Sequence, residues 1–188
     1  MKTSIFVHKN AYYIVERGGN IFMAEEQKIL SIIDYINQNN ICNKYLNKLK
    51  NIIGSSNVEI LSRVKEKQSA LDKMKVRHFV SANQISDFVG YMIITDTVED
   101  VYKIKNKIEN DLGNCLEEDY IKNPKNGYKS IHLNYLVEKD IPLEIQIKTK
   151  QMKAAQDIVH DKIYKNFNLS EELRSVLSNL VFLKVLKQ

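Results

Sequence analysis

The sequence has few of the features that build metal clusters, disulfide frameworks or membrane spans. Its 188 residues include only two cysteines, Cys42 and Cys115, and neither lies in a CxxC pair or a Cys/His cluster. We therefore expect neither a zinc site nor a disulfide framework, and a cytoplasmic location is the default. No apolar run reaches the roughly 18 residues that span a bilayer, and the N-terminus lacks the basic and apolar segments of a secretory leader. A membrane partner is accordingly not expected.

Internal repeats, low-complexity tracts and linkers are also missing, which favours a single domain over residues 1–188. Hydrophobic residues make up 44% of the chain and charged residues 27%, a composition typical of a globular protein with enough length to bury a core. The net charge of +5 and the isoelectric point near 9.0 favour anionic ligands such as nucleotides, RNA or acidic surfaces.

Two short strands with polar stripes follow the polar loop at 119–128. The polar residues are Ser130, His132 and Asn134 in the first strand and Glu144, Gln146 and Lys148 in the second. Both apolar faces reach one core only if the residue numbers of opposed residues add up to an even number, and a three-residue loop at 138–140 meets this condition. It sets His132 opposite Gln146 and Asn134 opposite Glu144. A carboxylate, an amide, an imidazole and a lysine then converge on one face. The alternative is an ordinary antiparallel sheet with one solvated face.

Hydrophobic periodicity and turn residues predict the remaining elements. Further strands are expected at 5–7, 12–15, 58–64, 88–94 and 114–118, with a turn at 18–20. Helices are expected at 24–53 with a break at 39–40, at 66–75, 97–112 and 150–166, and from Ser170 to 187. This order predicts an α+β domain with a mixed, largely antiparallel sheet flanked by helices. The broad apolar surface of the last helix predicts a homo-oligomer.

Cations gather ahead of the central strand. Lys65, Ser69 and Lys73 are spaced by four, so they share one face wherever the segment is helical, and Arg63 lies just before them. Such a row suits a polyphosphate, and the alternative is a solvated basic helix face. Asp87 stands immediately before the central strand, where it can hold Mg²⁺ or cap a turn.

Four segments, in this order, resemble the synthetase domain of RelA/SpoT-type enzymes, especially the small alarmone synthetases. They are Ser-Arg-Val-Lys at 62–65 with Ser69 and Lys73, Ile-Ser-Asp-Phe-Val-Gly at 85–90, Asp-Tyr-Ile-Lys-Asn-Pro-Lys-Asn-Gly-Tyr-Lys-Ser-Ile-His at 119–132, and Glu-Ile-Gln-Ile-Lys-Thr at 144–149. The last two segments are highly specific. The match implies a catalytic core at 58–165, a mainly helical N-terminal extension at 1–53 and a C-terminal helix at 170–187.

The resemblance implies a nucleotidyltransferase-like fold and a reaction. In this family the β,γ-pyrophosphate of ATP is transferred, with Mg²⁺, to the 3′-hydroxyl of GDP or GTP. By resemblance Asp87 and Glu144 bind the metal, and Glu144 also accepts the hydroxyl proton. The implied ATP-binding residues are Arg63, stacked on adenine, with Lys65, Ser69 and Lys73 on the phosphates. The implied acceptor-binding residues are Tyr128, stacked on the base, with Lys125, Asn126, His132 and Gln146.

Several positions depart from the family pattern. Met92 and Lys148 stand where arginines are usual, Glu118 where lysine is common and Val159 where glutamate is common. These changes leave two alternatives open, namely a toxin-like relative that pyrophosphorylates tRNA 3′ ends or adenine nucleotides, and a degenerate regulator that binds nucleotide or RNA without turnover. The Gly-Ser and Asp-x-Asp pair of ordinary nucleotide-adding enzymes is absent, since Gly54-Ser55 has no such partner downstream.

Overall fold

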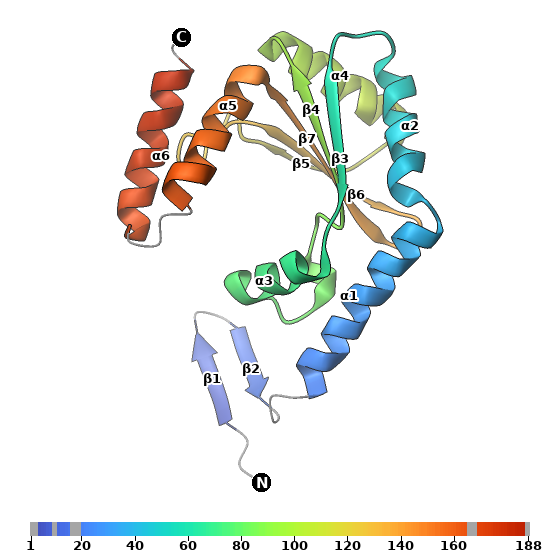
Figure 1. Cartoon of the computed structure of the whole chain (residues 1–188), viewed down its shortest axis with the longest axis vertical. Coiled ribbons are helices and arrows are strands. Elements are labelled where there is room, and N and C mark those ends of the chain that lie inside the picture. Colours follow the sequence, from blue (N-terminus) through green and yellow to red (C-terminus); the bar gives the residue numbers. More distant parts are fainter. Residues whose placement is uncertain (1–3, 9–10, 16–19, 165–168, 187–188) are drawn as a thin grey trace.

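The centre of the molecule is a five-stranded sheet with strand order β3-β4-β7-β6-β5 (Figure 1). The computed structural model describes residues 4–8, 11–15, 20–164 and 169–186. The strands are β1 Ser4–His8, β2 Ala11–Val15, β3 Glu59–Val64, β4 Val89–Thr95, β5 Leu116–Asp119, β6 Ile131–Val137 and β7 Ile141–Thr149. Only β4 and β7 pair in parallel within the five-stranded sheet, and its other neighbours are antiparallel. The predicted α+β class with a largely antiparallel sheet is confirmed.

Six α-helices are described around this sheet. They are α1 Asn20–Gln38, α2 Ile41–Ile53, α3 Lys67–Arg77, α4 Val98–Leu112, α5 Lys150–Val159, which continues as a π-helical turn over His160–Tyr164, and α6 Glu171–Val185. Thr97 and Ser170 cap α4 and α6 as predicted, because their hydroxyls accept hydrogen bonds from the backbone N–H groups of Asp100 and Leu173. None of the described helices combines the length and hydrophobicity that a bilayer span requires.

The N-terminal part consists of a hairpin and two consecutive helices. β1 and β2 pair antiparallel, which confirms the two predicted strands. The predicted break between the helices is also confirmed, since Asn40 adopts a left-handed conformation with φ of 51° between α1 and α2. Part of the predicted turn at 18–20 lies outside the described residues, and the division of the chain at 1–53, 58–165 and 170–187 stays a prediction.

The register of the β6–β7 hairpin is the one predicted from residue parity. Val137 pairs with Ile141 across a loop of three residues, in which Lys139 and Asp140 have φ of 55° and 61°. His132 therefore lies opposite Gln146, as expected. The alternating residues divide cleanly, because the apolar side chains enter the core while the polar ones stand on the other face.

The two faces of the sheet have different neighbours. Helices α2 and α4 pack on the apolar face, whose core includes Ile93, Leu133 and Ile145. The polar face is flanked by α5, which contacts β4 and β7, and α6 packs on the outer side of α5 (Figure 1). The α5–α6 pair has its own small core of Ala155, Val159, Ile163 and Phe182. The polar face thus stays open between α3 at one end and α5 at the other.

Candidate active site

Asp87 lies at the centre of a group of cations that we call the Asp87 cluster, which comprises Arg63, Lys65, Lys73 and Asp87. Its carboxylate is 2.8 Å from Lys65 Nζ, 2.9 Å from Lys73 Nζ and 3.4 Å from Arg63 Nη2. The sheet explains this proximity, because Lys65 follows the last residue of β3 while Asp87 lies just before β4, and the two strands are antiparallel neighbours. The predicted donor-side cations and the predicted metal ligand therefore form one group.

Asp87 is buried but stays an anion in this cluster. Burial alone would raise the pKa of the Asp87 carboxyl, yet hydrogen bonds and charge from Lys65 and Lys73 hold that pKa below its ordinary value. The carboxylate is only 5% exposed, so the pairs with the lysines are poorly screened by solvent. A polyphosphate at this position would meet two lysines and an arginine that already converge.

The helical explanation for the row of cations was partly wrong. Helix α3 begins at Lys67, so Lys65 lies between β3 and α3 and meets Lys73 only through their shared contact with Asp87. Ser69 lies on α3 one turn before Lys73 and is exposed. The structure therefore brings Lys65 and Lys73 together on Asp87, whereas Ser69 stays outside the cluster.

Glu144 occupies the middle of the polar face. Its Oε1 lies 3.3 Å from His132 Nδ1, and its Oε2 accepts a hydrogen bond of 2.7 Å from Gln146 Nε2. Burial and the nearby charge of Asp87 raise the pKa of Glu144, but His132 and Gln146 outweigh them and lower it below its ordinary value. The charge of Asp87 therefore reaches Glu144, although other contacts dominate its pKa.

A hollow of about 280 Å³ is lined by both Glu144 and Arg63, the exposed member of the Asp87 cluster. Gly90 pairs with Arg63 on one side and Glu144 on the other, so the floor of the hollow has no side chain between these two residues. Met92 also lines it, and Arg63 is the one cation among its described lining residues. Lys122 does not compensate, since it pairs with Asp119 at 3.3 Å and lies over the ring of Tyr102.

Aromatic rings gather where the sequence predicts that the acceptor binds. Tyr128 Oη lies 2.8 Å from His132 Nε2, and Tyr120 packs edge-on against both of these rings. Lys125 Nζ lies 3.3 Å from Tyr120 Oη and 4.8 Å from the centre of its ring. Glu118, which departs from the family pattern, accepts a hydrogen bond of 2.7 Å from the same hydroxyl. Tyr128, His132 and Gln146 are thus brought together, while Lys125 stands at the rim.

Helix α6 holds the loop at 125–128 in place. Ser175 Oγ donates a hydrogen bond of 2.8 Å to Asn126 Oδ1, and the ring of Phe182 packs edge-on against Tyr128. Gly127 has φ of 77°, and a Cβ at this position would lie 2.8 Å from Phe182 Cβ. A second hollow of about 190 Å³ lies between this loop and the two last helices. The position of Asn126 is therefore set by α6 as well as by its own loop.

The contact between Gly127 and Phe182 predicts a large effect of adding one methyl group. Gly127→Ala should destabilise the fold through backbone strain of about 1–2 kcal/mol at positive φ and a further overpacking cost of about 1–3 kcal/mol. Urea unfolding measures the sum. An added Cβ has open space at Gly113, so the overpacking cost is specific to Gly127. A loss at Gly127 of no more than about 2 kcal/mol, the backbone strain alone, would contradict the packing argument.

Some residues of the site were missed or left outside it by sequence reasoning. Lys148 was placed in the polar stripe but was given no role in binding or catalysis, and its side chain is fully buried within the site. Gln156 of α5 lines both hollows, and nothing in the helical pattern of α5 distinguishes it from an exposed residue. Val159, where the family usually has glutamate, packs in the small core between α5 and α6.

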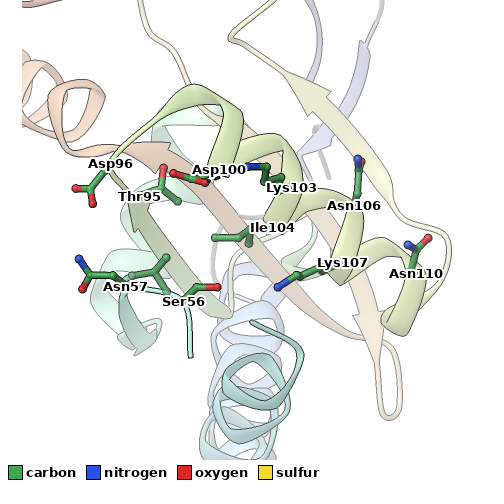
Figure 2. Close-up of a pocket in the computed structure, with 11 residues that line it drawn as sticks. Ser56, Asn57, Thr95, Asp96, Asp100, Lys103, Ile104, Asn106, Lys107 and Asn110 are labelled. Carbon is green, nitrogen blue, oxygen red and sulfur yellow. Dashed lines mark ion pairs between the residues drawn. The ribbon is translucent and has the colours of Figure 1, made fainter. Parts of the chain in front are cut away.

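A larger hollow of about 560 Å³ lies at the other end of β4 and does not belong to this site. Figure 2 shows it between α4 and the loop that carries Ser56 and Asn57. Lys103 of α4 is paired with Glu99 at 2.8 Å, and Asp96 is paired with Lys150 at 2.6 Å. These charges already have partners, so the hollow has no convergent group comparable with the Asp87 cluster.

The two carboxylates fit a Mg²⁺ ion that is completed by substrate. Mg²⁺ in phosphoryl-transfer sites is typically held by one or two carboxylates together with phosphate oxygens and water. Asp87 and Glu144 are both ionised and interact electrostatically, and the described residues contain no larger group of potential ligands. Asp87 and Glu144 are therefore the residues that would hold the ion.

The fold defined by these elements is that of the small alarmone synthetases. A small alarmone synthetase 1 from Bacillus subtilis, bound to its product pppGpp, superimposes with a TM-score of 0.62 at 22% identity over 88% of this chain and 92% of that one. The Type VI effector Tas1, in complex with its immunity protein, gives a TM-score of 0.62 at 14% identity over 88% of this chain and 98% of that one.

The chain belongs to the RelA/SpoT family. The model for the region found in RelA/SpoT proteins matches residues 62–168. A probable GTP diphosphokinase, the chloroplastic RSH3 of Arabidopsis thaliana, is 38% identical over 77 residues, which are 39% of this chain and 11% of the relative. A guanosine-3′,5′-bis(diphosphate) 3′-pyrophosphohydrolase of Spiroplasma citri is 27% identical over 173 residues, which are 85% of this chain and 23% of that protein. The chain thus spans less than a quarter of either relative.

Proposed function

We propose that this chain is a Mg²⁺- and ATP-dependent pyrophosphokinase that transfers the β,γ-pyrophosphate of ATP to the 3′-hydroxyl of GDP or GTP. The observation that supports this most is the position of Glu144, an ionised carboxylate on an open sheet face. It lines one hollow together with Arg63 of the Asp87 cluster and lies 3.3 Å from Nδ1 of His132 on the predicted acceptor side. The names of the family relatives, which include GTP diphosphokinases, agree with this assignment.

The reaction requires alignment of two substrates and removal of one proton. The acceptor oxygen forms a bond to the β-phosphorus of ATP, the bond from that phosphorus to the α,β-bridging oxygen breaks, and AMP leaves with the electron pair. Glu144 accepts the proton of the 3′-hydroxyl, and its lowered pKa keeps it ionised for this role. Mg²⁺ held by Asp87 and Glu144 would neutralise charge that develops on the phosphates.

The Asp87 cluster supplies the donor side. Lys65 and Lys73 pair with Asp87 in the free protein, so the ATP phosphates would take over these ammonium groups and release the Asp87 carboxylate toward the metal. Arg63 is more exposed than the lysines, with 67% of its side chain accessible, and is therefore free to stack on adenine. Ser69, which lies outside the cluster, would act only after a movement of α3.

The acceptor side would use the aromatic group around Tyr128. A base can stack on an aromatic face regardless of its identity, so the ring alone does not select guanine. Lys125 and Asn126 stand on the same loop and are exposed, within reach of acceptor phosphates or base edges. His132 and Gln146 lie beside the same region, because both contact Glu144. Together they would orient the 3′-hydroxyl toward Glu144.

The test is to identify the molecule that receives label from γ-labelled ATP. The purified chain is incubated with Mg²⁺ and, in parallel reactions, with GDP, GTP, an adenine nucleotide and deacylated tRNA. We expect AMP release together with labelled guanine nucleotide. Label on tRNA or on the adenine nucleotide would identify the toxin-like alternative, and AMP release without a labelled guanine nucleotide would refute the proposed reaction.

A second candidate is a nucleotide- or RNA-binding regulator without turnover, and Met92 is the observation that favours it. This side chain lines the hollow beside Glu144 in the place where the family pattern has arginine, and no described lysine replaces the lost charge there. Nucleotide binding by calorimetry without AMP release in the labelling assay would support this function. Turnover with any acceptor would exclude it.

We also propose a homo-oligomer formed through α6. Leu173, Val176, Leu180 and Leu183 on this helix are each more than 40% exposed. Apolar groups in such a row are costly in water, and a second copy of the helix would remove them from it. Light scattering of the purified chain would measure the oligomeric state, and a monomer at all concentrations would contradict the proposal.

A further inference from the structure

Five side chains around the predicted acceptor side form a closed circuit of polar contacts, which we call the Glu144 ring. Its members are Tyr128, His132, Glu144, Gln146 and Lys148. Its contacts are hydrogen bonds except for the approach of His132 Nδ1 to Glu144 Oε1 at 3.3 Å. Lys148 Nζ donates to Tyr128 Oη at 3.0 Å and to Gln146 Oε1 at 2.9 Å. From there one arm passes through His132 and the other through the amide of Gln146, and the two arms end on different oxygens of Glu144.

Lys148 is the origin of both arms. Its side chain is fully buried, and its third acceptor is Gln156 Oε1 of α5, at 2.6 Å. An ammonium group has three hydrogens and no acceptor capacity, so these three oxygens match it completely. The charged groups that act on it are Glu144 on its own strand and Asp157 and Lys153 on α5.

Lys148, which can only donate, and Glu144, which as a carboxylate can only accept, together fix the direction of the hydrogen bonds in the ring. Because Tyr128 Oη accepts from the ammonium group, its own hydrogen is available to His132 Nε2, which leaves the imidazole hydrogen on Nδ1, facing Glu144. Because Gln146 Oε1 also accepts from the ammonium group, the Gln146 amide must present its N–H to the other Glu144 oxygen. Both oxygens of Glu144 thereby receive donors.

We propose that Lys148 is a positioning residue, whose ammonium group sets the tautomer of His132 and the amide orientation of Gln146 so that both donate to Glu144. This inference rests on the proposed function for its activity readout, but the hydrogen-bond directions can be measured without any substrate. Removal of the charge would leave Tyr128 free to turn its hydroxyl hydrogen elsewhere. Glu144 would then lose its fixed orientation, although the three acceptors of Lys148 do not include it.

The charge that directs the ring depends on pH. Burial lowers the pKa of Lys148 to about 7, so the ammonium form is complete below this pH and is lost as the pH rises through it. An arginine at this position would stay charged throughout the accessible range. The hydrogen-bond directions that the ammonium group sets should therefore persist below about pH 7 and be lost above it. This pH dependence is expected only when residue 148 is lysine.

The experiment compares Lys148→Met and Lys148→Arg with the unmodified chain. Nitrogen-15 NMR of labelled histidine reports the His132 tautomer without nucleotide or metal. For the neutral imidazole, we expect the Nδ1–H form in Lys148→Arg and, at pH 7 and below, in the unmodified chain, and a mixture of tautomers in Lys148→Met. The transfer assay should show a loss of about 10–100-fold in Lys148→Met, with recovery to within about threefold in Lys148→Arg. Above pH 7 the transfer rate and the tautomer mixture of the unmodified chain should approach those of Lys148→Met.

Two controls keep the outcome interpretable. Lys150→Met removes a neighbouring lysine that pairs with Asp96 at the surface, and it should change neither readout. Tyr128→Phe removes the hydroxyl that connects Lys148 with His132 but keeps the aromatic side chain. It should disturb the His132 tautomer, and this test remains available even if Lys148→Met fails to fold. An unchanged tautomer in Lys148→Met or Tyr128→Phe, or equal losses of transfer in folded Lys148→Met and Lys148→Arg, would overturn the inference. Absence of transfer in the unmodified chain would instead count against the proposed function, while the NMR comparison would still decide the role of Lys148.

Discussion

Glu144→Gln is expected to lower the rate of pyrophosphoryl transfer by about 10²–10⁴-fold, the range associated with loss of a general base. The amide keeps the size of the side chain but cannot accept the 3′-hydroxyl proton or bind Mg²⁺ as an anion. It also meets the N–H of Gln146 and the imidazole of His132, which now face a group with only one acceptor oxygen. Initial rates of label transfer from γ-labelled ATP, at saturating acceptor, measure the effect.

The control for this substitution lies on the same hairpin. Glu138→Gln changes a glutamate of the β6–β7 loop that pairs with Lys44 on α2 and is remote from the polar face. We expect the transfer rate of this variant to stay within about twofold of the unmodified chain, since surface ion pairs contribute about 1 kcal/mol or less to stability. A Glu144→Gln protein that is folded and transfers at the unmodified rate would exclude Glu144 as the base.

Asp87→Asn is expected to abolish transfer and to destabilise the free protein. The substitution removes a metal ligand, and it also leaves the buried Lys65 and the half-buried Lys73 without an anionic partner. Loss of one member of a buried ion pair costs about 3 kcal/mol or more. Urea denaturation at neutral pH measures this loss, and the transfer assay with added Mg²⁺ measures the first effect.

The pH dependence of stability gives a second measure of Asp87. Its pKa is lowered in the folded state, so its contribution is complete above the ordinary carboxyl value of about 4 and is lost as the pH falls through the lower folded value. The unmodified chain should therefore lose more stability between pH 5 and pH 2 than Asp87→Asn does. Asp96→Asn, which removes a surface pair with Lys150, should leave the slope unchanged. Parallel curves for Asp87→Asn and the unmodified chain would contradict the pairing.

The hairpin at 131–149 was predictable because strand parity leaves little freedom. Both strands alternate polar and apolar residues, and a shift of one position would bury His132 or Glu144 and expose the core residues opposite them. The register observed in the structure follows from that constraint together with a loop of three residues at 138–140. The caps at Thr97 and Ser170 were predictable for a similar reason, since a hydroxyl at a helix start satisfies a local backbone donor.

The Asp87 cluster and the acceptor-side helices were harder to predict because they depend on contacts between distant segments. Spacing in the sequence grouped Lys65 with Ser69, but the β3–β4 pairing directs Lys65 to Asp87 instead. Phe182 is one apolar residue among many in α6, and its contact with Gly127 appears only when that helix is docked. Periodicity identifies the buried face of a helix but does not identify which residue meets a loop.

The three cations on Asp87 have a consequence for how the chain would distinguish nucleotides by charge. Asp87 acts as an internal competitor, since any anion that approaches Lys65 and Lys73 must displace a carboxylate that is already in contact with both. A triphosphate offers several negative charges against this single one, whereas AMP offers one phosphate. Under the proposed function, the lysines would return to Asp87 once pyrophosphate has left the donor, and the spent nucleotide would be expelled without a separate opening movement.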